Sequence, residues 1–181
     1  MNTRKIAFAG IIGALYAALT IALSFIGYGP IQFRIAEALC ILPFFFPFTA
    51  WGLFIGCVVA NLLSPYPLDI AVGTVATLLA AFCTAGISRF GRERLPVKLL
   101  ACLPPVIINA LAIGALLAYY TISADSSDST AVKFLTAFLI NGAQVGFGEL
   151  VVMYALGLPL MIYLPKSSVF QRFSAQLLAL D

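Results

Sequence analysis

The chain has 181 residues, of which 62% are hydrophobic and only 9% are charged. The charged share is about a third of that in a typical soluble domain, too little to cover a large apolar core, so a soluble fold is excluded. The net charge is +3, but the basic residues lie in short loops rather than along one amphipathic face, which argues against a nucleic-acid partner. We therefore expect an all-α integral membrane protein with one domain in the lipid bilayer.

The first apolar stretch, residues 6–26, follows Arg4 and Lys5. It is longer than the apolar core of a signal peptide and leads into further apolar segments, which favours a transmembrane helix over a cleaved leader. Within it, small residues recur at every fourth position, at Gly10, Ala14 and Ala18. Such a stripe lets another helix approach closely, but its spacing does not tell whether that helix belongs to the same chain or to a partner.

Five further spans are expected at 35–47, 49–63, 68–87, 97–120 and 131–163. The second and third spans are shorter than a full crossing, and Pro43 and Pro47 interrupt them, so a re-entrant hairpin is the alternative. The last segment is about 50 Å long if it is helical throughout, so it must tilt, protrude or break. Candidate positions for a break are Gly142, Gly146, Gly148, Gly157 and Pro159.

The positions of lysine and arginine predict the orientation of a six-helix bundle. With six crossings, eight of the ten basic residues fall on one side, and only Arg34 and Lys133 fall on the other. Because cytoplasmic loops carry the excess of positive charge, both termini and the loop from Arg89 to Lys98 are expected in the cytoplasm. The loops around Tyr28 and Pro65 then face outward.

Polar side chains in the spans carry the prediction of a binding site, because an ionisable group at bilayer depth costs at least a few kcal/mol. Most of them fall near the outer helix ends, where we expect them to line one outward-facing pocket. For Asn109 and Thr77, bonding between helices is the simpler interpretation. Arg34 and Glu37 are spaced to form an ion pair of their own. The predicted pocket residues are Arg34, Glu37, Asn61, Asp69, Asn141, Gln144 and Glu149.

Such a pocket favours a flat heteroaromatic molecule that carries amino groups. Carboxylates accept paired hydrogen bonds from planar N–H donors, and the rings of Tyr28, Phe33 and Tyr66 are placed to stack on the ligand, although aromatic residues at helix ends also form the interfacial belt. The chain has no histidine and its four cysteines stand singly, which predicts no catalytic centre, metal site or cofactor. We read those cysteines as small buried hydrophobic residues.

Three phrases of the chain resemble a known family. They are "IQFRIAEAL", "GLFIGCVVANL" and "LDIAVGTVATLLAA", within a match that runs from about residue 7 to 163. The chain resembles the queuosine-precursor transporter (QueT-type) family, whose members are taken to be substrate-binding S components of energy-coupling factor (ECF) transporters. One departure is Ala36, where the family pattern has serine; it puts only a minor hydrogen bond in doubt.

The resemblance implies a six-helix S component in the plasma membrane of a prokaryote, which captures a vitamin-like molecule outside and works with a coupling subunit and two ATPases. Ala14 and Ala18 match the Ala-x-x-x-Ala pattern that meets the coupling subunit in such proteins. The implied substrate is queuine, queuosine or an aminomethyl-deazaguanine precursor.

The chemistry of this substrate suggests roles for the pocket residues. We expect Glu37 to accept hydrogen bonds from the guanine-like edge, oriented by Arg34, unless Arg34 caps the carbonyl. Asp69 or Glu149 then faces the aminomethyl ammonium. The carbonyl and the remaining ring atoms are left to Asn61, Asn141 or Gln144.

Other functions use the same residues differently. The chain lacks a glycine-rich loop ending in Gly-Lys-Ser or Gly-Lys-Thr, so the energy for uptake must come from a partner or from an ion gradient. A self-sufficient transporter with Asp69 and Glu149 as proton carriers is one alternative, and an S component for another vitamin is a second. An intramembrane enzyme has little catalytic material to work with.

Overall fold

The computed structural model describes residues 2–27, 31–124 and 131–178, and these are helical apart from short connections. The first half of the chain forms two long helices on either side of a shorter pair. Its elements are α1 (Thr3–Ala22), α2 (Ser24–Gly27), the 3₁₀-helix η1 (Ile35–Ile41), α3 (Leu42–Phe45), α4 (Thr49–Asn61) and α5 (Asp69–Ile87).

The second half contains the two longest helices and ends in a short amphipathic one. Its elements are the 3₁₀-helix η2 (Ser88–Phe90), α6 (Leu95–Ala101), α7 (Leu103–Ser123), α8 (Ala131–Val152), the π-helix η3 (Met153–Gly157), α9 (Leu158–Tyr163), the 3₁₀-helix η4 (Leu164–Lys166) and α10 (Ser168–Leu178).

Within the described residues, four helical stretches are long and apolar enough to cross a membrane: Thr3–Ala22, Asp69–Phe90, Leu95–Ser123 and Ala131–Lys166. Many of their large apolar side chains point outward, as lipid-facing residues do. The all-helical membrane fold expected from the composition is thus confirmed. The apolar helices Ile35–Phe45 and Thr49–Asn61 are shorter, as expected for the second and third predicted spans.

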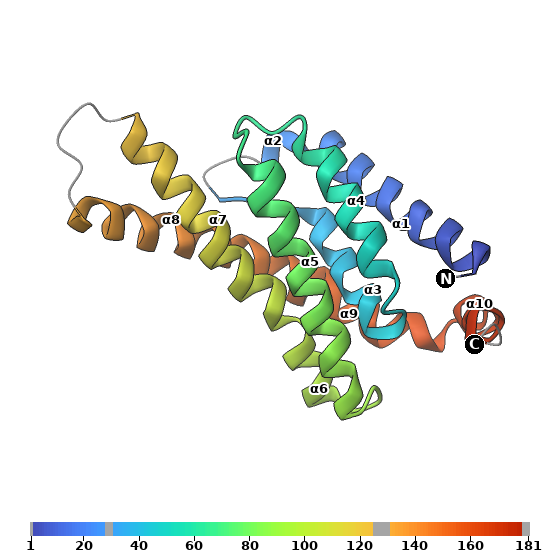
Figure 1. Ribbon diagram of the computed structural model, residues 1–181. Helices are drawn as coiled ribbons and strands as arrows, with labels where there is room; N and C mark the ends of the chain where they lie inside the picture. Colours follow the sequence, from blue (N-terminus) through green and yellow to red (C-terminus); the bar gives the residue numbers. More distant parts are fainter. Residues whose placement is uncertain (1, 28–30, 125–130, 179–181) are drawn as a thin grey trace.

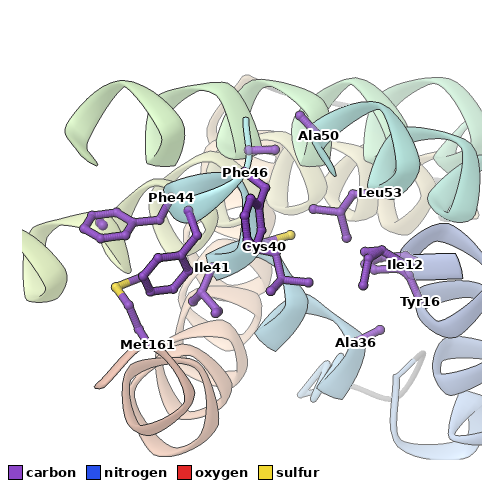
Figure 2. Close-up of a cluster of buried hydrophobic side chains, with 14 of the residues drawn as sticks. Ile12, Tyr16, Ala36, Cys40, Ile41, Phe44, Phe46, Ala50, Leu53 and Met161 are labelled. Carbon is purple, nitrogen blue, oxygen red and sulfur yellow. The ribbon is translucent and has the colours of Figure 1, made fainter. Parts of the chain in front are cut away.

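These two short segments form a hairpin whose first arm lies inside the bundle. α1 packs beside α4, α5 lies between α4 and α7, and α7 packs along α8 (Figure 1). η1 contacts α1, α5 and the π-helix η3, so it is surrounded by the longer helices. Figure 2 shows the core that results, in which Tyr16, Cys40 and Phe44 are fully buried.

The stripe of small residues on α1 has two edges with different surroundings. Gly13 faces Gly52 and Gly56 of α4 so closely that a Cβ on any of these glycines would collide with the opposing backbone. Gly10, Ala14 and Ala18 form the other edge and stay exposed. Gly10 and Ala14 line, with Trp51 of α4, an apolar groove of about 430 Å³. The close packing between α1 and α4 therefore uses the edge with Gly13, next to the predicted stripe of Gly10, Ala14 and Ala18.

The long last helical segment was expected to tilt, protrude or break, and the structure interrupts it with a π-helix. α8 continues through Gly142, Gly146 and Gly148, and the π-helix η3 then ends at Gly157. Pro159 follows in the first turn of α9. Because proline lacks an N–H and its ring clashes with the carbonyl four residues earlier, a wider turn before it relieves the conflict.

α10 was not anticipated from the sequence. It packs its Phe170 ring against Phe45 and Phe46, with centroid distances of 5.4 and 5.6 Å. Phe8, near the start of α1, packs on Phe46 from another direction, at 5.8 Å. The beginning of α1 and the helix α10 therefore both pack at the turn between α3 and α4, in agreement with Figure 1.

Candidate functional site

Glu37 lies at the centre of a buried hydrogen-bond network. The hydroxyl of Tyr16 on α1 donates to its Oε1, and the Thr77 hydroxyl of α5 donates to the same oxygen over 3.3 Å. The Cys40 thiol, one turn along η1, donates to Oε2 over 2.9 Å. Glu37 itself has no exposed surface. Neutral donors from three elements thus compensate a carboxylate that would be costly to bury alone.

A second set of contacts surrounds Asp69, the first residue of α5. Arg34, which precedes η1, forms a salt bridge to its Oδ2 over 2.7 Å, and the Ser64 hydroxyl donates to the same atom over 3.1 Å. The amide of Asn61 donates to the Asp69 backbone carbonyl over 2.9 Å. The basic partner of Asp69 is therefore Arg34, 35 positions away in the sequence.

The two sets are joined through Cys57 on α4. Asn61 donates to its sulfur over 3.4 Å, and the sulfur lies 3.7 Å from the Tyr16 hydroxyl oxygen. The predicted residues Arg34, Glu37, Asn61 and Asp69 thus form one continuous polar cluster contributed by three separate segments. Of the four cysteines, Cys40, Cys57 and Cys102 are buried as expected, whereas Cys83 is exposed. Cys40 and Cys57 are polar members of the cluster rather than plain apolar filling.

Glu149 on α8 forms a third buried group. The Asn109 amide of α7 donates to its Oε1 over 2.9 Å, so Asn109 bonds between helices as the simpler interpretation predicted. The carboxylate is close enough to Glu37 and Arg34 for their charges to interact with it. Next to it, Gly148 is packed against the backbone carbonyl of Gln32 with no room for a Cβ. The segment before η1 therefore rests on α8 beside Glu149.

Several buried acceptors around these groups have no hydrogen-bond partner among the described residues. They are Gln32 Oε1, Asn61 Oδ1, Asp69 Oδ1, Thr74 Oγ1 and Glu149 Oε2. A buried acceptor without a donor costs about 1–3 kcal/mol, and more if it is charged. Apart from the Thr74 hydroxyl, which can also donate, these atoms only accept, so the cluster is suited to a ligand rich in N–H groups.

The other predicted pocket residues that the structure describes are less buried. Asn141 bonds to the Ala137 carbonyl of its own helix over 2.9 Å and lines a separate hollow of about 470 Å³ with Thr121 and Lys133. Gln144 and Phe33 are half-buried. Tyr66 is also half-buried and packs on Tyr120 with ring centroids 5.1 Å apart. Tyr28 lies outside the described residues.

Reasoning from the sequence missed Tyr16, Gln32 and Ser64. Tyr16 was hidden because it lies in an apolar helix, where a tyrosine fits a core position equally well. Gln32 stands next to the charged pair in the phrase "IQFRIAEAL", which was the available signal. Over the described residues, no group of three or more His, Cys, Asp or Glu side chains is arranged to hold a metal ion.

Comparison with known proteins gives two matches. The family model described as QueT transporter matches residues 6–166. The queuosine precursor transporter QueT of Lactococcus lactis subsp. cremoris (strain MG1363) is 40% identical over 93 residues, which cover 50% of this chain and 54% of that protein. The aligned part thus spans about half the length of this relative. No solved structure matches the chain.

Proposed function

Because the chain belongs to the QueT transporter family, with nearly its whole length matched, we propose that it is the membrane-embedded substrate-binding subunit of an importer for a queuosine precursor. The substrate is a deazaguanine base or nucleoside taken up from outside. The chain acts with an ECF coupling subunit and two ATPases, in the plasma membrane of a prokaryote. Six crossings place both termini in the cytoplasm, and the protein has no catalytic step of its own.

The observation that carries this proposal is the buried cluster of acceptors that lack donors among the described residues. It includes the charged oxygens Asp69 Oδ1 and Glu149 Oε2 and the amide oxygen Asn61 Oδ1. Such groups are expensive to keep in a membrane protein unless a ligand uses them. A guanine-like ring presents several adjacent N–H donors and one carbonyl, which matches carboxylate and amide groups.

The geometry also changes the expected division of roles. Both oxygens of Glu37 already accept hydrogen bonds from the protein, whereas Asp69 and Glu149 each keep one oxygen without a partner among the described residues. We therefore assign direct contact with the substrate to Asp69, Asn61 and Glu149. Glu37, hydrogen-bonded to Tyr16, supports the site without direct contact with the substrate.

The proposed coupling surface is the exposed edge of α1. Gly10 and Ala14 line a groove of about 430 Å³ whose walls are almost wholly apolar, and the neighbouring edge is already used by α4. Small residues at this spacing allow a helix of another protein to come close. The match of Ala14 and Ala18 to the Ala-x-x-x-Ala pattern supports a coupling subunit as the occupant.

One experiment tests the binding and the coupling together, by comparing the parent with Ala14→Leu. Purified parent is expected to bind a deazaguanine base with submicromolar affinity, and vesicles with the complete complex are expected to take it up in the presence of ATP. Ala14→Leu should keep the binding, because the side chain of residue 14 lines the outer groove and takes no part in the hydrogen bonds of the polar cluster. It should abolish uptake, because leucine fills the groove.

The outcomes separate the parts of the proposal. A parent that binds no deazaguanine compound contradicts the substrate assignment. Unchanged uptake by Ala14→Leu contradicts the coupling surface. Uptake by the chain alone, driven by a proton gradient without ATPases, establishes instead the self-sufficient transporter.

A further inference from the structure

We propose that Glu149, held by Asn109 and flanked by Gln32, is a subsite for a protonated amine, so that the protein selects cationic substrates over neutral ones of the same ring system. This inference rests on the proposed function, because it narrows the class of substrate for the same site. It assigns the amine to one of the two carboxylates that the sequence left open. It also adds Gln32, which the sequence did not single out, and it gives Asn109 a role at the site.

Glu149 is the least compensated of the buried carboxylates. It is 1% exposed, and its Oε2 has no hydrogen-bond partner among the described residues. Glu37 accepts hydrogen bonds at both oxygens, and Asp69 is paired with Arg34. Within the described part of the chain, the hydrogen-bond donor to Glu149 is the neutral amide of Asn109. A buried carboxyl group in this situation either takes up a proton or requires a counter-charge, since desolvation of the ion costs several kcal/mol.

The balance of buried charge indicates the sign of that counter-charge. Three buried carboxylates, those of Glu37, Asp69 and Glu149, face one buried guanidinium, that of Arg34. Lys98, the other buried basic residue among the described ones, lies on α6 near the end of the bundle and not in the cluster. The charge of Glu37 repels that of Glu149, and the charge of Arg34 attracts it. A cation from the ligand improves this balance, whereas an anion worsens it.

Gln32, whose backbone packs on α8, supplies a second buried acceptor without a partner among the described residues. Its backbone carbonyl is packed on Gly148, which places residue 32 beside Glu149. The Gln32 side chain is 2% exposed, and its Oε1 has no partner within the described part of the chain. An ammonium group has three N–H donors and no acceptor. A carboxylate oxygen and an amide oxygen satisfy two of them, and Gly148 allows the backbone of residue 32 to pack directly on α8 next to Glu149.

Asn109 acts as a positioning residue. It holds the Glu149 Oε1 from α7, so Oε2 is left for the ligand. α7 and α8 pack closely along their length, which keeps this hydrogen bond in place.

The test compares two ligands that share a ring but differ in charge. Aminomethyl-deazaguanine carries a protonated amine, and cyano-deazaguanine carries a neutral nitrile at the same position. Calorimetry on the purified full-length chain is expected to show that the parent prefers the aminomethyl compound by at least about tenfold, as a buried charge-assisted hydrogen bond implies. Glu149→Gln should abolish this preference while it continues to bind the cyano compound. Glu93→Gln, which removes an exposed carboxylate in the segment before α6, should leave both affinities unchanged.

Gln32→Leu provides a second variant that keeps every charge in the protein. It should reduce the preference for the aminomethyl compound without weakening binding of the cyano compound. The proposal is overturned if the parent binds both compounds equally, or if Glu149→Gln keeps the preference. If Glu149→Gln does not fold, an unchanged preference in Gln32→Leu overturns it instead. A parent that binds neither compound contradicts the proposed function, which makes the two failures distinguishable.

Discussion

At the scale of single residues, Glu37 and Glu149 show how one side-chain type takes two roles. Both carboxylates are buried. Glu37 receives donors from Tyr16, Thr77 and Cys40, so its charge is stabilised by the protein itself. Glu149 has an oxygen with no donor among the described residues. The first arrangement contributes to stability, and the second leaves stabilisation to a ligand.

Removing the Tyr16 hydroxyl should therefore lower stability. Tyr16→Phe takes one donor from the Glu37 carboxylate while the ring stays in the core. We expect a loss of about 1–3 kcal/mol, because a buried charged acceptor loses a partner. Thermal unfolding in detergent measures it, and Tyr119→Phe, at an exposed ring, is the control. Equal melting temperatures for Tyr16→Phe and the parent would mean that Tyr16 contributes nothing to this network.

The positions of the charges could be predicted from the sequence, but not their partners. Arg34 and Asp69 stood out because an ionisable residue in an apolar run is costly. Their pairing depends on where η1 lies against the start of α5, which is a tertiary contact between segments 35 positions apart. For the same reason the contact of residue 32 with α8 could not be predicted. Its position beside Glu149 depends on the packing of the segment before η1 on α8.

At the scale of elements, the long helices follow from apolar length, whereas the irregular ones follow from contacts. The span predicted at 68–87 corresponds to α5 at Asp69–Ile87. The 3₁₀ geometry of Ile35–Ile41 was not predicted, because 3₁₀ and α-helices share much the same local preferences. The helix α10 was also missed. Its amphipathic sequence follows the last span and carries too few apolar residues to be read as a span itself.

The two edges of α1 provide a matched test of helix packing. Gly13→Ala should destabilise the protein by about 1–3 kcal/mol, because the added methyl collides with the backbone of Gly52. Gly10→Ala should change stability by less than about 1 kcal/mol, because a Cβ there meets no atom among the described residues. Both variants place the same methyl on the same helix, so unfolding curves compare position alone. Similar losses for both would contradict the assignment of the inner edge to α4.

At the scale of the whole molecule, the short hairpin determines the shape of the site. η1 and α3 together rise by about 20 Å, and α4 by a similar amount, whereas the hydrocarbon core of a bilayer is about 30 Å thick. If its outer end reaches the outer surface, the turn between α3 and α4 stops short of the opposite one. Irregular backbone at that depth must be covered by protein. Phe8 of α1 and Phe170 of α10 provide this cover.

This arrangement predicts which reagents reach the turn. In a chain with Cys83 replaced by alanine, Pro65→Cys should react with an impermeant maleimide from outside, and Arg92→Cys only from the cytoplasmic side. Pro47→Cys lies at the exposed tip of the hairpin turn. It should react slowly, and only from the cytoplasmic side, because Phe170 packs against the adjoining Phe46.

Ending the chain after Ser167 removes α10 and should accelerate the labelling of Pro47→Cys. Arg92→Cys in the same shortened chain serves as the control for access of the reagent to the cytoplasmic side. Labelling of Pro47→Cys from outside would contradict six crossings. A residue that stays unreactive from the cytoplasm without α10 would place the turn in the hydrocarbon, as in a re-entrant hairpin. In that case lipid, and not α10, would cover the turn on its cytoplasmic side.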